Sequence, residues 1–231
     1  AGAGETQSGE EAGEEAGGGT AAEVELPWGR FLDNVAVRAL GYAHFCNNWG
    51  HYVLLAWLPT FYSDDLNMSL TSASLLALLP PLANVAVSAV AAPLADTLIA
   101  RGAPVTAVRK GCQAVAFLGP AACMAGAWAA HGDRNATVEL LSLGIGLASF
   151  SVAGLYSNHQ DLSPKYASAL LGLTNTAGAL PGVLGVSFTG WLLTRTNDWE
   201  LSMFLPTILF YLTGTAVYLR WGSAEAQRFA D

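Results

Sequence analysis

Six stretches of mostly apolar residues, each long enough to cross a lipid bilayer, limit the folds open to this chain. A transmembrane helix needs about 20 such residues, and only short charged or Gly/Pro-rich breaks separate the stretches. Charged residues make up 12% of the chain, about half the fraction of a soluble domain. We therefore predict an all-α membrane protein with a bundle of six transmembrane helices. The expected spans are residues 35–62, 73–100, 106–130, 138–157, 167–193 and 201–219.

The two ends of the chain differ from the apolar region. Residues 1–25 hold seven glutamates and no Lys or Arg, so they account for most of the net charge of −8. A Gly/Glu/Ala-rich segment without apolar periodicity cannot bury a core and should be disordered. The chain lacks an initiator Met, and we expect it to be a fragment. The predicted domains are a disordered acidic loop (1–26), a six-helix bundle (27–221) and a C-terminal tail (222–231).

The Lys and Arg residues predict the topology, because loops on the cytoplasmic side carry the excess of positive charge. With the N-terminus on the cytoplasmic or stromal side, eight of the ten cationic residues lie at inside ends and two lie outside. Both termini are therefore expected inside. The inside group is Arg30, Arg38, Arg101, Arg109, Lys110, Lys165, Arg220 and Arg228, and the outside pair is Arg134 and Arg195.

Polar residues inside the spans are the candidates for function, because they are costly in lipid and usually face a cavity or another helix. In the first span, two histidines and two asparagines recur at i, i+3, i+4 and i+7 and share one helical face. They can line an anion cavity with neutral donors, or they can simply hydrogen-bond between helices. The candidate cavity residues are His44, Asn47, Asn48, His51, Tyr52, Asn84 and Asn175.

Two later spans carry helix-disturbing residues. Pro80 and Pro81 precede Asn84, and prolines free backbone carbonyls and kink a helix. The fifth span contains the pair Gly178 and Gly182 in a GxxxG pattern, which permits close helix packing. Such discontinuities often flank transport sites, although ordinary kinking explains the prolines equally well. Tight packing is the main interpretation of the glycine pair, and a gating helix that flexes at Gly178–Gly182 is the alternative.

Two predicted inside loops carry dense polar groups that can stabilise one state of an alternating-access cycle. The first loop joins an acid to several bases, and the second is the run from Tyr156 to Tyr166. Pro164 disfavours a continuous helix across the second loop. The candidate gate residues are Asp96, Arg101, Arg109, Lys110, Asn158, His159, Asp161 and Lys165.

Motifs of soluble enzymes are absent from the sequence, which has no phosphate-binding P-loop, no dinucleotide fingerprint and no HExxH. The three cysteines lie in apolar stretches without metal-ligand spacing. We therefore expect no catalytic residue, no metal site, no cofactor and no nucleic-acid partner.

Three groups of motifs follow one another along the chain. They are His44–Gly50 with Trp57–Tyr62, Ala95–Gly102 with Val108–Lys110, and Asn158–Ala167 followed by Gly172–Gly178. In this order they resemble the anion:cation symporter family of the major facilitator superfamily. The first group is similar to that family's seventh helix, the second to its loop between helices eight and nine, and the third to its signature between helices ten and eleven.

This resemblance covers about residues 27–220, and within the family it favours the plant and algal branch of plastid and Golgi inorganic phosphate transporters. It implies a twelve-helix fold, of which this chain matches helices seven to twelve. It also implies that membrane-embedded arginines for the anion belong to an N-terminal half not present here. The position that Asn47 occupies looks like an arginine in the vesicular glutamate transporters. The absence of that charge here argues against glutamate as the substrate.

The expected function is the C-terminal half of a multi-pass secondary transporter that moves a small anion by symport with Na⁺ or H⁺. Inorganic phosphate is the first expectation, and an organic anion such as ascorbate or a dicarboxylate is the alternative. A non-transporting six-helix interaction subunit is a second hypothesis. The expected partners are membrane lipid, the missing N-terminal half and the anion. A plastid (chloroplast) membrane is the expected location, with the Golgi or plasma membrane as alternatives.

Overall fold

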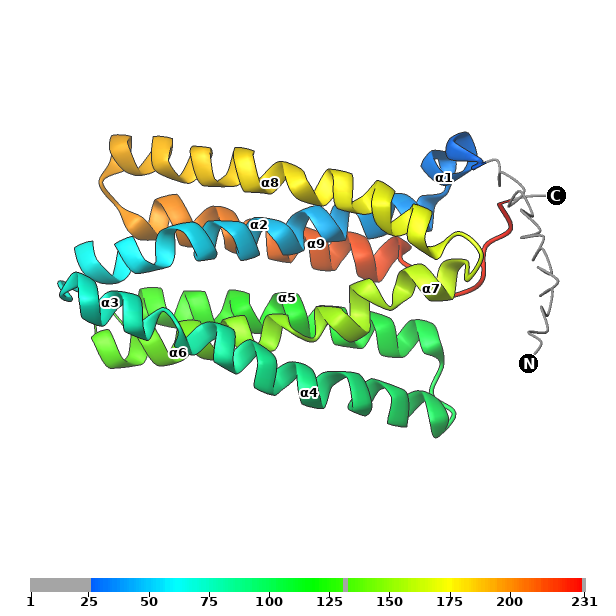
Figure 1. Cartoon of the computed structure of the whole chain (residues 1–231), viewed down its shortest axis with the longest axis horizontal. Helices are drawn as coiled ribbons and strands as arrows, with labels where there is room; N and C mark the ends of the chain where they lie inside the picture. Colours follow the sequence, from blue (N-terminus) through cyan, green and yellow to red (C-terminus); the bar gives the residue numbers. More distant parts are fainter. Residues whose placement is uncertain (1–25, 131–132, 230–231) are drawn as a thin grey trace, which may run out of the picture.

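The structure is a computed structural model that describes residues 26–130 and 133–229. The predicted acidic loop 1–26 lies almost entirely outside these residues. Within them the chain forms a bundle of long, roughly parallel and antiparallel helices (Figure 1). The elements are α1 (Trp28–Asp33), α2 (Val35–Asp64), α3 (Leu70–Leu76), α4 (Leu79–Ala100), α5 (Val105–Ala129), α6 (Arg134–Ala148), η1 (Val152–Tyr156), α7 (Asn158–Leu162), α8 (Ala167–Thr196), η2 (Glu200–Phe204) and α9 (Leu205–Trp221).

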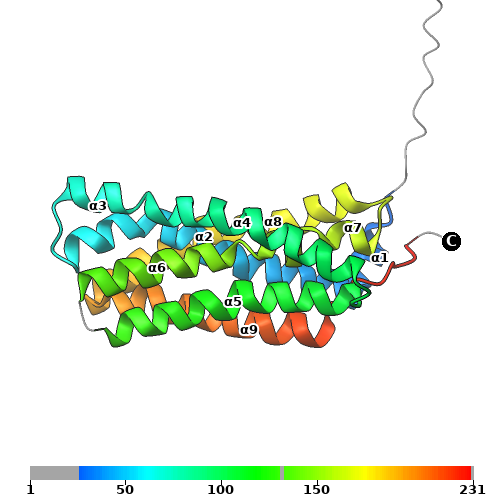
Figure 2. The ribbon, with the colours of Figure 1, turned by 90° about the horizontal axis from the view of Figure 1, so that it is seen from below.

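Five helical stretches of the described residues are long and apolar enough to cross a membrane. The remaining long helix, α2, has 30 residues like α8, but its polar residues lower its mean hydropathy. It lies inside the bundle against α8 and α9 (Figures 1 and 2). The prediction of an all-α membrane bundle is confirmed. The five apolar stretches are Leu70–Ala100, Val105–Ala129, Arg134–Leu162, Ala167–Thr196 and Glu200–Trp221.

Two of these stretches are interrupted where the sequence disfavours a regular helix. The second span breaks between α3 and α4, and Pro80 and Pro81 lie in the first turn of α4, where a missing N–H is tolerated best. The fourth span passes from α6 through the π-helical turn η1 into α7. π-helical turns inside longer helices are often found at functional sites.

The contact between α2 and α8 is close because glycines of α8 face α2. A Cβ on Gly178 would lie 2.8 Å from His44 Cδ2, and one on Gly190 would lie 2.9 Å from Trp57 Cζ2. Large side chains of α2 thus pack onto the bare backbone of α8, as small residues allow in membrane helices. The α8 helix continues through Pro181 without a break.

The C-terminal segment 222–229 folds back across the end of the bundle where α1 lies. The Gln227 amide N–H donates to the Leu162 carbonyl oxygen at 2.8 Å, and Arg30 Nη1 donates to the Phe229 carbonyl oxygen at 3.1 Å. The rings of Phe31 and Phe229 meet edge to face at 4.9 Å, and both side chains are buried. Both ends of the described chain therefore lie at one end of the bundle, as an even number of crossings requires.

Candidate substrate-facing site

The polar face of α2 divides into a buried pair and an open pair. His44 and Asn48 are buried against α8, with exposed fractions of 1% and 6%. Asn48 Nδ2 donates to the Gly178 carbonyl oxygen at 2.8 Å. Asn47 is half-buried, and His51 is exposed. His44 and Asn48 therefore make contacts between helices, while Asn47 and His51 keep exposed surface, and cavity lining stays a prediction for these two residues.

Thr174 of α8 joins the two buried histidines through its hydroxyl group. Thr174 Oγ1 lies 3.1 Å from His44 Nδ1 and 2.7 Å from His159 Nε2. His159 Nδ1 lies 3.0 Å from the Tyr156 carbonyl oxygen, which can only accept, so this nitrogen carries a proton. The Thr174 hydroxyl group also lies 3.2 Å from the Leu171 carbonyl oxygen. With a neutral His159 its proton goes to His159 Nε2, which is closer, and Thr174 Oγ1 accepts from His44 Nδ1–H.

This proton arrangement leaves His44 Nε2 as a buried acceptor. Nε2 has no hydrogen-bond partner among the described residues. Buried polar atoms are nearly always paired, and an exception needs a reason. His44 Nε2 is therefore the imidazole nitrogen of this cluster that lacks a hydrogen-bond partner among the described residues.

Tyr156, at the end of η1, covers the buried histidine. Its ring stands edge-on to the His44 ring, with the centroids 5.2 Å apart and an angle of 83° between the planes. Its hydroxyl group reaches Asn47 Nδ2 and Asn48 Oδ1, each at 3.5 Å, which is long for a hydrogen bond. Tyr156 is 37% exposed whereas His44 is 1% exposed, so Tyr156 lies between His44 and the open face.

The other candidate cavity residues lie apart from this cluster or at its edge. The Tyr52 ring is half-buried beside His51, with 5.3 Å between ring centroids. Asn84 of α4 is half-buried, and its Nδ2 lies 3.4 Å from the Ile145 carbonyl oxygen of α6. Asn175 is exposed on α8. Asn84 thus belongs to the contact between α4 and α6, while Asn175 lies on the open side of α8.

Within the predicted gate network, one buried ion pair forms. Arg109 of α5 binds Asp161 of α7 through two nitrogens, at 2.6 Å and 3.2 Å, and its Nη1 donates to the Ala153 carbonyl oxygen at 2.9 Å. Nearby, Asn158 Nδ2 donates to the Tyr218 hydroxyl oxygen at 2.8 Å. These contacts fasten η1 and α7 to α5 and α9.

The remaining candidate gate residues stay outside this group. Lys110 Nζ donates to the Leu219 carbonyl oxygen at 2.9 Å, and Lys165 Nζ lies 5.0 Å from the centre of the Tyr166 ring. Asp96 and Arg101 are exposed, and their side chains make no hydrogen bond within residues 26–130 and 133–229. The structure thus gathers Arg109, Asn158, His159 and Asp161 and leaves the other four at the rim.

Tyr156 and Thr174 were not among the candidate residues of the sequence analysis. Tyr156 opens the polar run of the second inside loop, and Thr174 lies in the segment Gly172–Gly178 that carries the family resemblance. Neither residue type signals a site by itself, because Tyr and Thr are common in membrane helices. Their roles depend on the meeting of η1, α2 and α8 in space.

The profile of the Major Facilitator Superfamily matches residues 4–186, most of the chain. The chain belongs to the major facilitator superfamily. Three similar relatives within this superfamily carry transporter names. Probable anion transporter 5, chloroplastic, of Oryza sativa subsp. japonica is 49% identical over 207 residues, which are 89% of this chain and 44% of that protein.

The other two relatives come from Arabidopsis thaliana. The sodium-dependent phosphate transport protein 1, chloroplastic, is 41% identical over 202 residues, 87% of this chain and 38% of that protein. The ascorbate transporter, chloroplastic, is 41% identical over 201 residues, 87% of this chain and 36% of that protein. The chain thus spans under half the length of these relatives. The resemblance to the plastid branch of major facilitator anion transporters is confirmed, and these relatives are transporters rather than enzymes.

Proposed function

We propose that this chain is the C-terminal half of a secondary active transporter for small anions, with inorganic phosphate as the first candidate. The observation that carries the proposal is the open polar face formed by Asn47, His51, Tyr52 and Tyr156. This face offers amide, imidazole and phenol donors between α2 and η1. Neutral donors bind an anion more weakly than a fixed positive charge does, so the anion can also dissociate.

An N-terminal half in the same transporter completes this proposal. The share of buried residues is 11% in the apolar stretch that contains α4 and 28% in α8, against 50% in α5. Both α4 and α8 therefore have wide apolar faces that a second helical bundle can cover. Alternating access then consists of one bundle rocking against the other around a central site.

Two coupling ions are compatible with the site. A proton has an acceptor in His44 Nε2, which is buried without a partner among the described residues. Sodium is supported by the name of the phosphate-transporting relative. The proposed symport thus uses H⁺ or Na⁺, and the two are separated by imposing each gradient alone.

Organic anion transport is the second candidate, because one relative is named an ascorbate transporter. Ascorbate carries one charge and several hydroxyl groups, and the same neutral donors suit it. A six-helix subunit without transport activity is a third candidate, from a different class. The genomic reading frame distinguishes this candidate: six further spans encoded upstream in frame contradict it.

Uptake by the full-length parent protein in liposomes tests the proposal. Radiolabelled phosphate uptake is measured with an imposed Na⁺ gradient, an imposed proton gradient, or neither, and with unlabelled ascorbate or malate as competitors. Asn47→Ala and Tyr156→Phe should lower uptake at least several-fold. Asn135→Ala, which changes an exposed amide at the other end of the bundle, should not. The absence of gradient-driven uptake of any of these anions contradicts the proposal.

We place the protein in a plastid membrane, with both termini on the stromal or cytoplasmic side. The relatives' chloroplastic names support the compartment, and the eight cationic residues at the α1 end support the orientation. The sequons that begin at Asn67 and Asn135 lie at the opposite end, and both asparagines are exposed. An N-glycan on either residue, detected as a glycosidase-sensitive mobility shift, contradicts a plastid location.

A further inference from the structure

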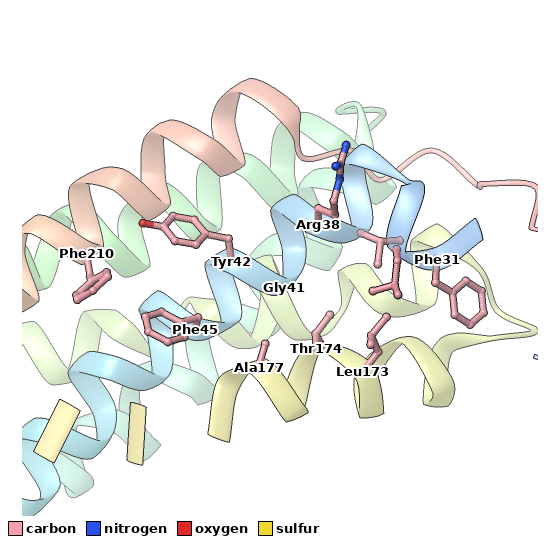
Figure 3. A pocket seen from close by; sticks show the side chains of 11 residues that line it. Phe31, Arg38, Gly41, Tyr42, Phe45, Leu173, Thr174, Ala177 and Phe210 are labelled. Atoms are coloured by element: carbon pink, nitrogen blue, oxygen red, sulfur yellow. The ribbon is translucent and has the colours of Figure 1, made fainter. Parts of the chain in front are cut away.

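An apolar groove runs between α8 and α9 (Figure 3). Its volume is about 530 Å³. The floor is the first part of α2, and α1 closes one end. The walls are formed mainly by Phe31, Tyr42, Phe45, Leu173, Ala177 and Phe210.

The contact between α2 and α8 lies between this groove and the open polar face, and Thr174, which joins His44 and His159 in that contact, also lines the groove. Leu173 and Ala177 border the groove, whereas Asn175 and Ala179 lie on exposed parts of α8 that are not among the lining residues. On α2 the groove takes Tyr42 and Phe45, which lie about a third of a turn or more around the helix from Asn47 and His51. An occupant of the groove therefore need not compete with a substrate on the other side.

Arg38 lies beside the groove near the end of the bundle that holds both chain termini. It also borders a second, smaller hollow of about 230 Å³, together with Val35, Val217 and Trp221. Arg38 is exposed, and its guanidinium group makes no hydrogen bond or ion pair with any residue that the structure describes. A cation between two apolar hollows matches a molecule with an anionic head and two apolar chains.

The depth of Arg38 matches the headgroup region of a bilayer. Trp28 and Trp221 are each 47% exposed at this end of the bundle, and exposed tryptophans favour the membrane interface. Arg38 is the fourth residue of α2, about 5 Å along the helix from its start. A long arginine side chain can extend from such a position to the phosphate level.

We propose that Arg38 and the two hollows beside it form a binding site for an anionic two-chain lipid of the inner leaflet. The lipid phosphate or sulfonate accepts hydrogen bonds from the Arg38 guanidinium group, whose flat fork of donors suits these anions. One acyl chain lies in the groove against Phe45, Ala177 and Phe210. Asp33, the acid on α1, is exposed, and Arg30 and Arg220 lie at the same end of the bundle. Phe31, held by Phe229 and Tyr166, gives the groove a fixed end wall.

Native mass spectrometry of the full 231-residue chain in mild detergent tests this site without any transport assay. Phosphatidylglycerol and phosphatidylcholine with identical acyl chains are titrated separately, and glycerol 3-phosphate serves as a headgroup without chains. Wild-type protein should bind one phosphatidylglycerol at least 10-fold more tightly than phosphatidylcholine. It should not bind glycerol 3-phosphate measurably in the same range.

Two pairs of variants locate the site. Arg38→Gln should abolish the preference for phosphatidylglycerol, while Arg101→Gln, an equal change of charge at the far edge of the same end, should keep it. Ala177→Phe should weaken both lipids by filling the groove, while Ala179→Phe, on an exposed part of α8 outside the groove, should weaken neither. Circular dichroism shows whether each variant keeps its helices, and only folded variants are compared.

Several outcomes overturn the proposal. Equal affinity for the two lipids removes the role of the anionic head, and an unchanged preference in Arg38→Gln removes the role of that residue. Glycerol 3-phosphate binding as tight as that of the lipid assigns the site to a free anion. A dimer that Ala177→Phe abolishes, with no bound lipid, assigns the groove to a second copy of the chain.

Discussion

Arg109 and Asp161 form a two-point ion pair between α5 and α7, in which Arg109 Nε lies 2.6 Å from Asp161 Oδ2 and Nη2 lies 3.2 Å from Oδ1. The two side chains are 11% and 18% exposed. Arg109 also holds the Ala153 carbonyl oxygen inside η1. One guanidinium group therefore ties α7 to the π-helical turn η1 that presents Tyr156.

Removing one partner of this pair should destabilise the bundle more than removing both. Arg109→Gln or Asp161→Asn leaves a buried charge without its partner, which costs about 3 kcal/mol. The double variant leaves neither charge, so its loss should be clearly smaller than the sum of the two. Thermal unfolding in detergent for the four proteins of this cycle measures the difference. Additive losses show that the two residues act independently and contradict the interpretation.

Arg109→Lys separates the effect of charge from that of geometry. Lysine keeps the positive charge but has a single nitrogen, so it cannot bind both carboxylate oxygens and the Ala153 carbonyl oxygen together. We expect a midpoint of unfolding between those of wild type and Arg109→Gln. A midpoint equal to that of wild type shows that the second and third contacts contribute nothing.

Thr174→Val should be costly because it removes the hydroxyl group shared by His44 and His159. Both imidazoles stay buried and lose a partner, and an unpaired buried polar group costs about 1–3 kcal/mol. Thr176→Val is the matched control: Thr176 is exposed, and its hydroxyl group bonds only to the Gly172 carbonyl oxygen of its own helix. The midpoint of unfolding should fall for Thr174→Val and stay near wild type for Thr176→Val. Equal midpoints contradict the bridging role.

Gly178→Ala tests the close approach of α2 and α8. The new Cβ would lie 2.8 Å from His44 Cδ2 and 2.9 Å from Asn48 Nδ2, so the helices must separate or the two side chains must move. Such overpacking costs about 1–3 kcal/mol. Gly172→Ala meets no atom within 4 Å and should stabilise α8 slightly, since glycine is a poor helix former. Opposite shifts of the unfolding midpoint support the interpretation, and a harmless Gly178→Ala contradicts it.

The helices were more predictable than the contacts between them. Apolar length finds five of the six predicted spans in the described residues, because lipid solvation acts on each span separately. The first predicted span forms the 30-residue helix α2, whose polar residues lower its mean hydropathy. The break before Pro80 was also foreseeable, because proline disturbs the preceding turn of a helix whatever packs against it. The burial of the polar residues on α2 was not predictable from the sequence. Four residues on one helical face can be buried or exposed, depending on where α8 crosses α2. That crossing is fixed by Gly178 and Gly190 meeting His44 and Trp57, a match between distant segments.

The gate residues show the same limit. Asp161 and Lys165 stand at helical spacing, yet α7 ends at Leu162 and Ser163 is extended, as Pro164 suggested. Asp161 instead pairs with Arg109, 52 residues earlier in the chain. Charge complementarity in a sequence gives the set of possible partners, and the packing of α5 against η1 selects one of them. The segment 222–229, predicted as a tail, is likewise held by contacts to α1, α5 and Leu162 that local sequence does not encode.

Asp65 offers a test of stability against pH at the other end of the bundle. Partial burial first, and then the charge of Asp198, raise the pKa of the Asp65 carboxyl group above its ordinary value. The folded state therefore disfavours the ionised form, so ionisation of Asp65 lowers stability. This penalty is absent below the unfolded pKa of about 4, grows as pH rises toward the folded pKa, and is complete above it.

Asp65→Asn should raise the midpoint of unfolding at pH 7.5, and its advantage should shrink as the pH falls toward 4. Asp64→Asn changes an exposed neighbouring carboxylate and should have a smaller effect at pH 7.5. A constant advantage of Asp65→Asn from pH 4 to pH 7.5 shows that its origin is packing rather than charge.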